Sequence, residues 1–293
     1  MAIQENHEII NTPPVDAASV LLLRDSDEGL QVLLMRRAQA SQVLGGAYVF
    51  PGGKVDAADH DLAALQSLSE APEQLRQRLD EATLAPERAA GLFMAALREA
   101  FEECGVLAGQ DAGGSALATQ LRTQVGHSGW HQSLRQQGQA LRTEALLPWS
   151  RWITPRQPAV TNKRFDTRFF LTRIDADQHA SHDNFETTDS VWLTPRQALS
   201  RYAAGDMDLV APQIMSLYQL KAHRTVDEAL HEARQRPPAL IEPHPVSEDG
   251  KRILTYPGDE RHPVPRRAMR GPTRLQLLQG RFVPLGGMAE LLD

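Results

Sequence analysis

Three glutamates lie close together in a segment that predicts an amphipathic helix. Residues 98–106 read REAFEECGV and contain Glu99, Glu102 and Glu103. At about 100° per residue, their carboxylates centre roughly 150° away from an apolar stripe on the same helix. Three like charges this close destabilise a helix mildly unless a cation lies between them. Mg²⁺ or Mn²⁺, which take oxygen ligands, would be such a cation, whereas an acidic face in contact with water is the alternative interpretation.

A turn suited to phosphate binding precedes this helix. Residues 48–50 predict a short strand that ends at Pro51-Gly52-Gly53. Paired glycines let a backbone turn sharply and approach a ligand closely. A strand, a glycine turn and an acidic helix together could form a site for a pyrophosphate and a metal ion.

The glycine turn and the acidic helix together resemble the signature of the Nudix hydrolases. Residues 98–106 match its second half, Arg-Glu-hydrophobic-any-Glu-Glu-any-Gly-hydrophobic, if Ala100 counts as the hydrophobic residue. The resemblance implies an α/β fold, in the form of an α/β/α sandwich with a mixed sheet. It also implies metal-dependent hydrolysis of a diphosphate joined to another group. The metal ligands for Mg²⁺ or Mn²⁺ that it implies are Glu99, Glu102, Glu103 and the carbonyl of Gly53.

The first half of the signature departs from the family pattern in two ways. Asp59 stands where the family has a glutamate that holds the motif arginine, here Arg98, and Asp56 or Asp61 could take this role instead. The segment between the glycine turn and the acidic helix is also longer than in the family signature, which implies an insertion of about 31 residues. We expect this insertion, at about residues 60–90, to be helical. A long insertion here resembles the branch that contains mammalian peroxisomal coenzyme A diphosphatases.

Further charged residues are candidates for catalysis and phosphate binding. Family members differ over which glutamate is the general base, and Glu99 and Glu186 are both candidates here. For Glu186, an exposed loop carboxylate is the alternative interpretation. Strand alternation places Arg164 and Arg168 on the same side of an expected strand, where they could clamp phosphates or face solvent.

Residues 33–53 resemble a motif of the coenzyme A diphosphatases in this superfamily. Arg37 and Gly46 are the most diagnostic matches, whereas Met35 replaces a threonine and Gln42 replaces an arginine. The glutamine removes a charged, bidentate phosphate donor, so within this motif Arg37 remains as a candidate ligand for a substrate phosphate, beside Arg164 and Arg168. Coenzyme A or an acyl-coenzyme A is the leading substrate. ADP-ribose or a dinucleotide is the alternative substrate. A Nudix-fold module that senses a nucleotide without cleaving it is the alternative function.

The composition is typical of a soluble intracellular enzyme. A net charge of −6 and a pI near 5.9 argue against a broad nucleic-acid surface, which needs an excess of Lys and Arg. Cys104 is the only cysteine, so no intrachain disulfide can form. We expect no membrane partner, because no apolar run approaches ~18 residues. The terminal residues 290–293 are not a Ser-Lys-Leu peroxisomal address. Cytoplasm is the expected location.

The pattern along the chain predicts strands interleaved with helices, which favours a mixed sheet covered on both faces. We expect strands at 17–23, 32–35, 149–153, 165–174 and 190–193, a second helical insertion or flap at 109–145, and helices that begin at Thr194 and Thr225. Gly105 should cap the acidic helix. The Nudix hydrolase domain would span 15–235.

The last part of the chain, residues 236–293, differs from the rest in composition. It contains nine of the 19 prolines, which excludes long helices. We expect a wrapped tail or a small β appendage with short strands at 253–256 and 281–284. This extension could cover the active site, form the contact of a homodimer, or be a structural wrap without a catalytic role.

Overall fold

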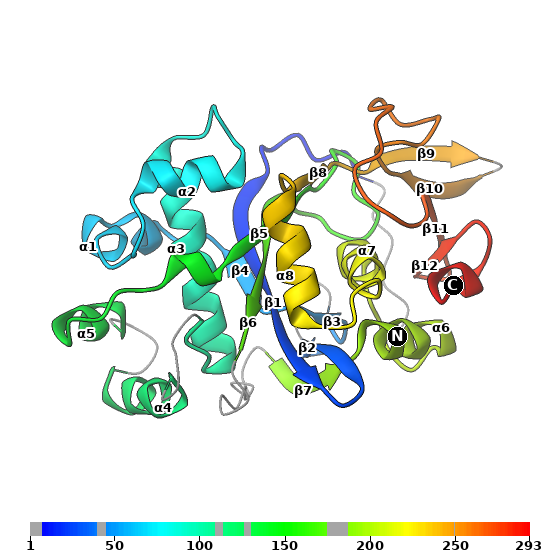
Figure 1. Cartoon of the computed structure of the whole chain (residues 1–293). Coiled ribbons are helices and arrows are strands. Elements are labelled where there is room, and N and C mark those ends of the chain that lie inside the picture. The colour runs from blue at the N-terminus through cyan, green and yellow to red at the C-terminus, as the bar shows by residue number, and fades with distance from the viewer. Residues whose placement is uncertain (1–7, 40–44, 109–113, 126–129, 175–186, 249) are drawn as a thin grey trace.

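A mixed β-sheet between two layers of helices forms the centre of the molecule (Figure 1). The computed structural model describes residues 8–39, 45–108, 114–125, 130–174, 187–248 and 250–293. The main sheet consists of β1 (Val15–Ser26), β2 (Gly29–Arg37), β3 (Tyr48–Val49), β4 (Gly52–Lys54), β5 (Leu147–Ile153), β6 (Phe165–Arg173), β7 (Thr187–Leu193) and β8 (Ala239–Ile241). The expected α/β/α sandwich with a mixed sheet is confirmed.

Strand β1 organises this sheet. The main strand order is β3-β2-β1-β6-β5-β8, with β4 paired to the first half of β1 and β7 paired to β2. Strand β1 is antiparallel to β2 and parallel to β6. Its residues 20–23 are buried on alternate faces, Leu21 and Leu23 in one core and Val20 and Leu22 in the other. This explains the continuous apolar run, because both faces of the strand are covered.

One helical layer contains the acidic helix and the insertion before it. Helix α3 (Pro86–Cys104) packs its apolar side on β1, and Gly105 caps it in the left-handed conformation with φ 68°. The preceding segment is helical, as expected, with the 3₁₀-helix η1 (Ala57–His60), α1 (Leu62–Leu65) and α2 (Pro72–Leu79). The later part of this layer contains α4 (Gly114–Val125), α5 (Trp130–Gln136) and the 3₁₀-helix η2 (Thr143–Ala145).

The second helical layer covers the opposite face of the sheet. It contains α6 (Pro195–Ala204), α7 (Ala211–Leu220) and α8 (Val226–Gln235). The expected starts of α6 and α8 are confirmed, because the hydroxyls of Thr194 and Thr225 accept hydrogen bonds from backbone N–H groups three residues later. None of the helices in the described part of the chain is long and apolar enough to cross a membrane.

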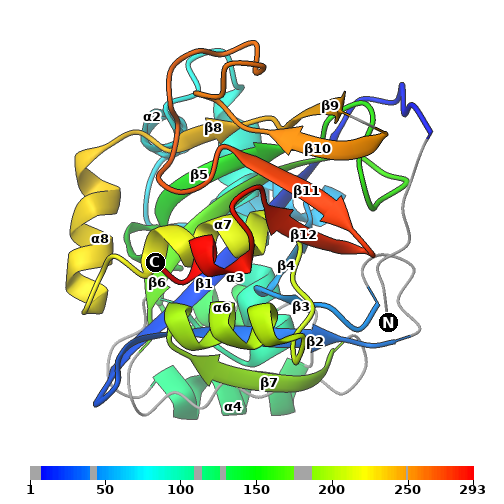
Figure 2. The same ribbon diagram turned by 90° about the vertical axis from the view of Figure 1, so that its right-hand side faces the viewer.

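The proline-rich extension folds against this second layer. It forms an antiparallel sheet of β9 (His244–Glu248), β10 (Lys251–Thr255), β11 (Arg274–Leu278) and β12 (Arg281–Pro284), followed by η3 (Met288–Leu291) (Figure 2). Two of these strands, β10 and β12, match the expected segments, whereas β9 and β11 were not expected. Leu254 and Phe282 share one buried core with Ile214 and Leu217 of α7. The extension is therefore packed into the body of the protein.

Candidate active site

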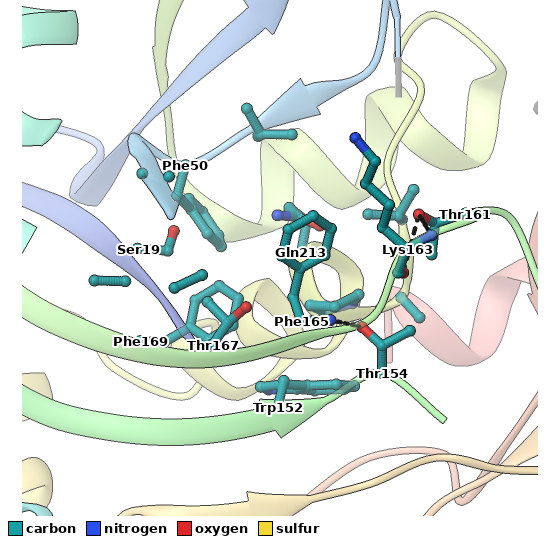
Figure 3. A pocket seen from close by; sticks show the side chains of 18 of the residues that line it. Ser19, Phe50, Trp152, Thr154, Thr161, Lys163, Phe165, Thr167, Phe169 and Gln213 are labelled. Atoms are coloured by element: carbon teal, nitrogen blue, oxygen red, sulfur yellow. Dashed lines mark hydrogen bonds between the residues drawn. The ribbon is translucent and has the colours of Figure 1, made fainter. Parts of the chain in front are cut away.

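A cavity of about 850 Å³ opens between the acidic helix, the main sheet and the extension. Glu99, Glu102 and Glu103 line one end of it together with the Gly52-Gly53 turn. Most of the remaining wall is apolar. It includes Trp152, Phe165 and Phe169 from the main sheet (Figure 3). Val210 and Ala211 at the start of α7 and Leu254 and Phe282 from the extension also line it.

The two glycines allow the backbone to pass directly beside the carboxylates. The backbone N–H of Gly52 donates to Glu103 Oε2 at 3.0 Å. A Cβ atom on Gly53 would lie 2.3 Å from Glu99 Oε1, and one on Gly52 would lie 2.4 Å from the Ala18 carbonyl oxygen. At Gly52 the clash is with backbone atoms and φ is 153°, so only glycine fits there. At Gly53 a side chain would push the Glu99 carboxylate out of its position. The glycine turn and the acidic helix expected from the sequence thus lie in direct contact, with the Gly52 backbone beside Glu103 and the Gly53 backbone beside Glu99.

Arg98 connects these carboxylates to the start of the insertion. Its Nε and Nη2 donate to the two oxygens of Asp59 at 2.9 and 3.0 Å, and its Nη1 donates to Glu99 and Glu102 at 2.9 and 3.1 Å. The Asp59 side chain is 1% exposed, whereas that of Asp56 is 66% exposed and 3.7 Å from Arg98. The structure therefore places Asp59, one methylene shorter than the glutamate of the family pattern, in direct contact with the motif arginine.

The charge of Arg98 is firmly retained in this position. Burial alone would lower the pKa of its guanidinium, but the hydrogen bonds to Asp59 and the charges of Glu99, Asp59 and Glu102 outweigh burial and raise it. Arg98 is therefore a permanent cation that orients the glutamates.

The donor set at this end of the cavity fits a hard divalent cation. No three His, Cys, Asp or Glu side chains among the described residues converge into a ready-made metal-binding group. Nevertheless, Glu99, Glu102 and Glu103 line the same cavity, and carboxylate oxygens are the ligands that Mg²⁺ and Mn²⁺ prefer. Arg98 pairs with Asp59, Glu99 and Glu102, and Glu103 accepts from Gly52 instead. One guanidinium therefore stands against four carboxylates, and a divalent cation would neutralise the surplus negative charge.

The other predicted phosphate ligands differ in their placement. Arg37 lines the cavity, and its Nε is buried without a hydrogen-bond partner in the described part of the chain. On β6, the side chains of Phe165, Thr167 and Phe169 line the cavity, and strand alternation places those of Arg164 and Arg168 on the opposite face. Glu186 and Gln42 lie outside the described residues.

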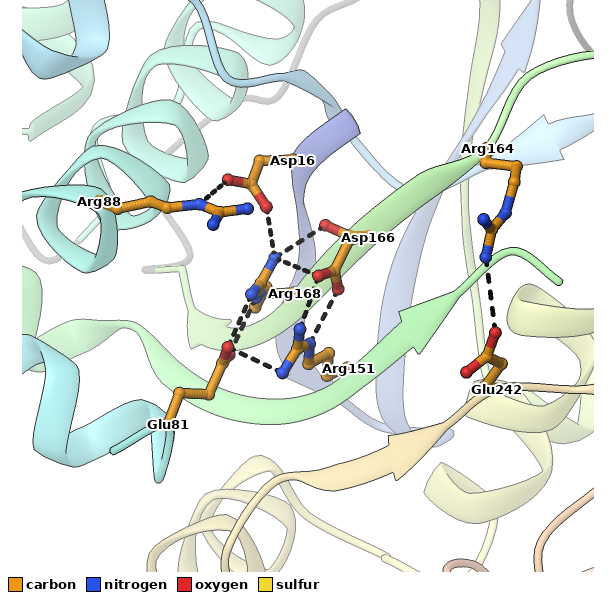
Figure 4. Close-up of polar contacts among 8 residues, drawn as sticks. All are labelled: Asp16, Glu81, Arg88, Arg151, Arg164, Asp166, Arg168 and Glu242. Carbon is orange, nitrogen blue, oxygen red and sulfur yellow. Dashed lines mark hydrogen bonds and ion pairs between the residues drawn. The ribbon is translucent and has the colours of Figure 1, made fainter. Parts of the chain in front are cut away.

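Arg164 and Arg168 instead have partners within the protein (Figure 4). Arg164 Nε donates to the Thr154 carbonyl at 2.9 Å, and its Nη2 lies 3.5 Å from Glu242. Arg168 is buried and donates to Asp16 at 2.8 Å and to Glu81 at 2.7 and 2.9 Å. Neither is brought to the acidic end of the cavity.

Several cavity residues gave no recognisable signal in the sequence. Gln213, in the first turn of α7, lines the cavity (Figure 3), as do Leu254 and Phe282 of the extension. The two apolar residues look like ordinary strand positions, and Gln213 belongs to no motif. Only the Pro212 beside it, at the start of α7, marks a helix N-terminus that could face a ligand.

Two known proteins are similar in sequence to this chain over most of its length. A protein of Xenopus laevis named acyl-coenzyme A diphosphatase NUDT19 is 27% identical over 276 residues, which cover 80% of this chain and 71% of that protein. The Gallus gallus protein of the same name is 28% identical over 305 residues, covering 85% of this chain and 79% of that protein.

A solved structure shows the same fold. The crystal structure of a NUDIX hydrolase from Alicyclobacillus acidocaldarius superimposes with a TM-score of 0.58 at 27% sequence identity, covering 75% of this chain and 97% of that one. The family model described as the NUDT19 Nudix domain matches residues 15–220, which is well over half of the chain. With the glycine turn and the three glutamates in one cavity, the match means that this chain belongs to the NUDT19 Nudix-domain family and is a Nudix hydrolase.

Proposed function

We propose that this chain is a metal-dependent diphosphatase whose substrate is coenzyme A or an acyl-coenzyme A. The observation that carries this proposal is that Glu99, Glu102 and Glu103 and the Gly52-Gly53 turn form one wall of a large cavity. A phosphoanhydride is negatively charged and repels hydroxide, so its hydrolysis needs positive charge beside the reacting oxygens. A bound Mg²⁺ or Mn²⁺ would supply that charge and would acidify a water molecule.

The described residues of the cavity would bind the metal ion, position its ligands and bind the substrate phosphate. Glu99 and Glu103 would be direct metal ligands, Glu102 would bind directly or through water, and the Gly53 carbonyl would add a further oxygen. Glu99 is also the candidate general base among the described residues, with Glu186 as the alternative. Arg98 would hold Glu99 and Glu102 in position through the hydrogen bonds from its Nη1, while Arg37 would bind a substrate phosphate.

Three observations support the choice of substrate. The curated relatives in Xenopus laevis and Gallus gallus are named acyl-coenzyme A diphosphatases. The cavity of about 850 Å³ lies towards the upper end of the ~300–1,000 Å³ typical of ligand sites, and it is mostly apolar beyond its acidic end. Arg37 suits a coenzyme A phosphate, because a guanidinium pairs bidentately with phosphate.

A substrate panel with added Mg²⁺ tests the proposal. We expect kcat/KM to be highest for coenzyme A or an acyl-coenzyme A, and lower for ADP-ribose and a dinucleotide. We also expect Arg37→Ala to raise KM for coenzyme A more than for ADP-ribose, which lacks the 3′-phosphate. Efficient cleavage of ADP-ribose with coenzyme A untouched would favour the alternative substrate, and binding of these compounds without any turnover would favour a nucleotide sensor.

A further inference from the structure

Gln213 is a buried polar residue in the cavity wall, and its amide oxygen lacks a hydrogen-bond partner among the described residues. It is 6% exposed and lines the cavity wall (Figure 3). Its amide oxygen Oε1 is buried and has no partner among the residues that the structure describes. Because unpaired buried acceptors are destabilising and uncommon in folded proteins, this oxygen is a candidate contact for a ligand.

The position of Gln213 favours such a contact. Val210, Ala211, Pro212 and Gln213 all line the cavity, so the N-terminus of α7, with its partial positive charge, faces it. The last torsion of a glutamine side chain is broad. Rotation about it exchanges the positions of the amide oxygen and nitrogen without any movement of the helix, so either atom can face the cavity.

The surrounding side chains suit a nucleotide. Arg37 and Lys163 line the same cavity as Gln213, and the nucleotide half of coenzyme A carries a 3′-phosphate that the pantetheine half lacks. Trp152 and Phe165 supply aromatic rings in the cavity wall, and nucleobases stack on such rings. A glutamine amide also matches an adenine edge, since its oxygen accepts from the 6-amino group while its nitrogen donates to a ring nitrogen.

We propose that Gln213 recognises the adenine base of the substrate, with Oε1 accepting a hydrogen bond from the exocyclic 6-amino group. This inference rests on the proposed function only in that the substrate contains adenine, which coenzyme A and ADP-ribose share. The pantetheine arm then lies on the other side of the diphosphate, so Gln213 selects the base and not the acyl chain.

Kinetics with a substrate that lacks the 6-amino group test the assignment. The variants are Gln213→Leu and, as a matched control, Gln219→Leu on the same helix, where Gln219 is buried but does not line the cavity. The substrates are coenzyme A and its analogue with purine in place of adenine. We expect the wild type and Gln219→Leu to cleave the analogue about tenfold less efficiently, in kcat/KM, than coenzyme A. Gln213→Leu should lose this preference.

A binding measurement separates this inference from the proposed function. Calorimetric titration with adenosine 3′,5′-bisphosphate and its purine analogue needs no turnover, and circular dichroism checks that each variant is folded. We expect Gln213→Leu to bind the adenine compound about tenfold more weakly than the wild type and without preference for the base. If neither coenzyme A nor ADP-ribose is cleaved but this loss occurs, the proposed function fails and the inference stands. A preference for adenine that persists in Gln213→Leu, or no binding of the bisphosphate to the wild type, would overturn the inference.

Discussion

At the scale of single residues, Arg98 sets the geometry of the acidic end of the cavity. It donates to both oxygens of Asp59 and to Glu99 and Glu102, so it fixes two glutamates from α3 against the segment that follows the glycine turn. Glu103 is held separately, by the backbone N–H of Gly52. The three carboxylates are therefore oriented before any ligand binds, which reduces the cost of assembling a metal site.

Replacement of Glu103 by glutamine tests its assignment as a metal ligand. The amide oxygen of glutamine can still accept from Gly52, so Glu103→Gln should keep the fold while removing one negative charge. We expect kcat to fall by at least about a hundredfold, because residues that merely support a ligand typically cost about 10–100-fold. Glu87→Gln, at an exposed position on the same helix, should turn over like the wild type. Unchanged activity of Glu103→Gln at saturating Mg²⁺ would refute the assignment.

The contact between Asp59 and Arg98 should contribute to stability. Asp59→Ala removes two hydrogen bonds to a buried guanidinium, and each such bond to a charged group contributes about 1.5–3 kcal/mol. We therefore expect the free energy of unfolding, measured by urea titration, to fall by about that amount or more. Asp56→Ala, which removes an exposed carboxylate 3.7 Å from Arg98, should cost less than about 1 kcal/mol. If Asp56→Ala lowered the free energy of unfolding more than Asp59→Ala does, Arg98 would be held by Asp56 instead.

The sequence predicted some of these residues better than others. The three glutamates share one helix, so their spacing alone places them on one side of it. Asp59 reaches Arg98 only through the fold, and the resemblance supplied that expectation. Alternation showed that Arg164 and Arg168 share a face of β6, but both faces of this strand are covered, so no sequence pattern indicates which face meets the cavity.

At the scale of elements, a group of ion pairs joins the insertion to the main sheet (Figure 4). It contains the carboxylates of Asp16, Glu81 and Asp166 and the guanidinium groups of Arg88, Arg151 and Arg168. Glu81 lies between α2 and α3, whereas Arg168 lies on β6. The group therefore anchors the segment before α3 on the face of the sheet that is turned away from the cavity.

Loss of the arginine at the centre of this group should be strongly destabilising. Arg168→Met leaves Asp16, Glu81 and Asp166 without their buried partner, and removal of one partner from a buried ion pair typically costs about 3–5 kcal/mol. Arg173→Met is the control, because Arg173 pairs with Asp25 and Asp227 near the surface and should contribute at most about 1 kcal/mol. Chemical unfolding of the two variants measures the difference. If Arg168→Met and Arg173→Met lowered the free energy of unfolding equally, the group of ion pairs would not anchor the insertion.

The same ion pairs should make stability depend on pH. Burial would raise the pKa of Asp16, but hydrogen bonds and charges from Arg88 and Arg168 lower it below the usual 3.8. A carboxyl whose pKa is depressed by folding stabilises the folded state above its unfolded pKa, and this stabilisation is lost as the pH falls through its folded pKa. Unfolding curves at pH 7 and pH 3 should therefore show that Asp16→Asn is less stable than the wild type at pH 7, and that the difference shrinks at pH 3. A difference that is independent of pH would contradict this account.

Helices were easier to predict than short strands. Thr194, Thr225 and Gly105 give local cap signals that do not depend on distant residues. In the extension, prolines obscure the strands, yet Pro245 and Pro284 lie on β9 and β12, the two edges of the second sheet. Edge strands tolerate proline because one side of their backbone needs no partner. Only the folded structure shows which strands are edges.

At the scale of the whole molecule, the cavity depends on the packing of the extension against the Nudix domain. The acidic wall comes from α3 and the glycine turn, whereas Leu254 of β10 and Phe282 of β12 complete the apolar wall. Both residues also belong to the core shared with α7. The sequence predicts the chemistry of the acidic wall, but it could not predict the apolar wall, because residues that line a cavity and residues that fill a core have the same pattern.

Identification of the products from coenzyme A tests the central claim most directly. The purified protein, with Mg²⁺ and coenzyme A, is analysed by chromatography with mass detection, and a sample with a chelator in place of the metal is the control. Attack on the diphosphate by the proposed site predicts adenosine 3′,5′-bisphosphate and 4′-phosphopantetheine in equal amounts, formed only when the metal is present. Intact coenzyme A, or the same products in the presence of the chelator, would contradict the account.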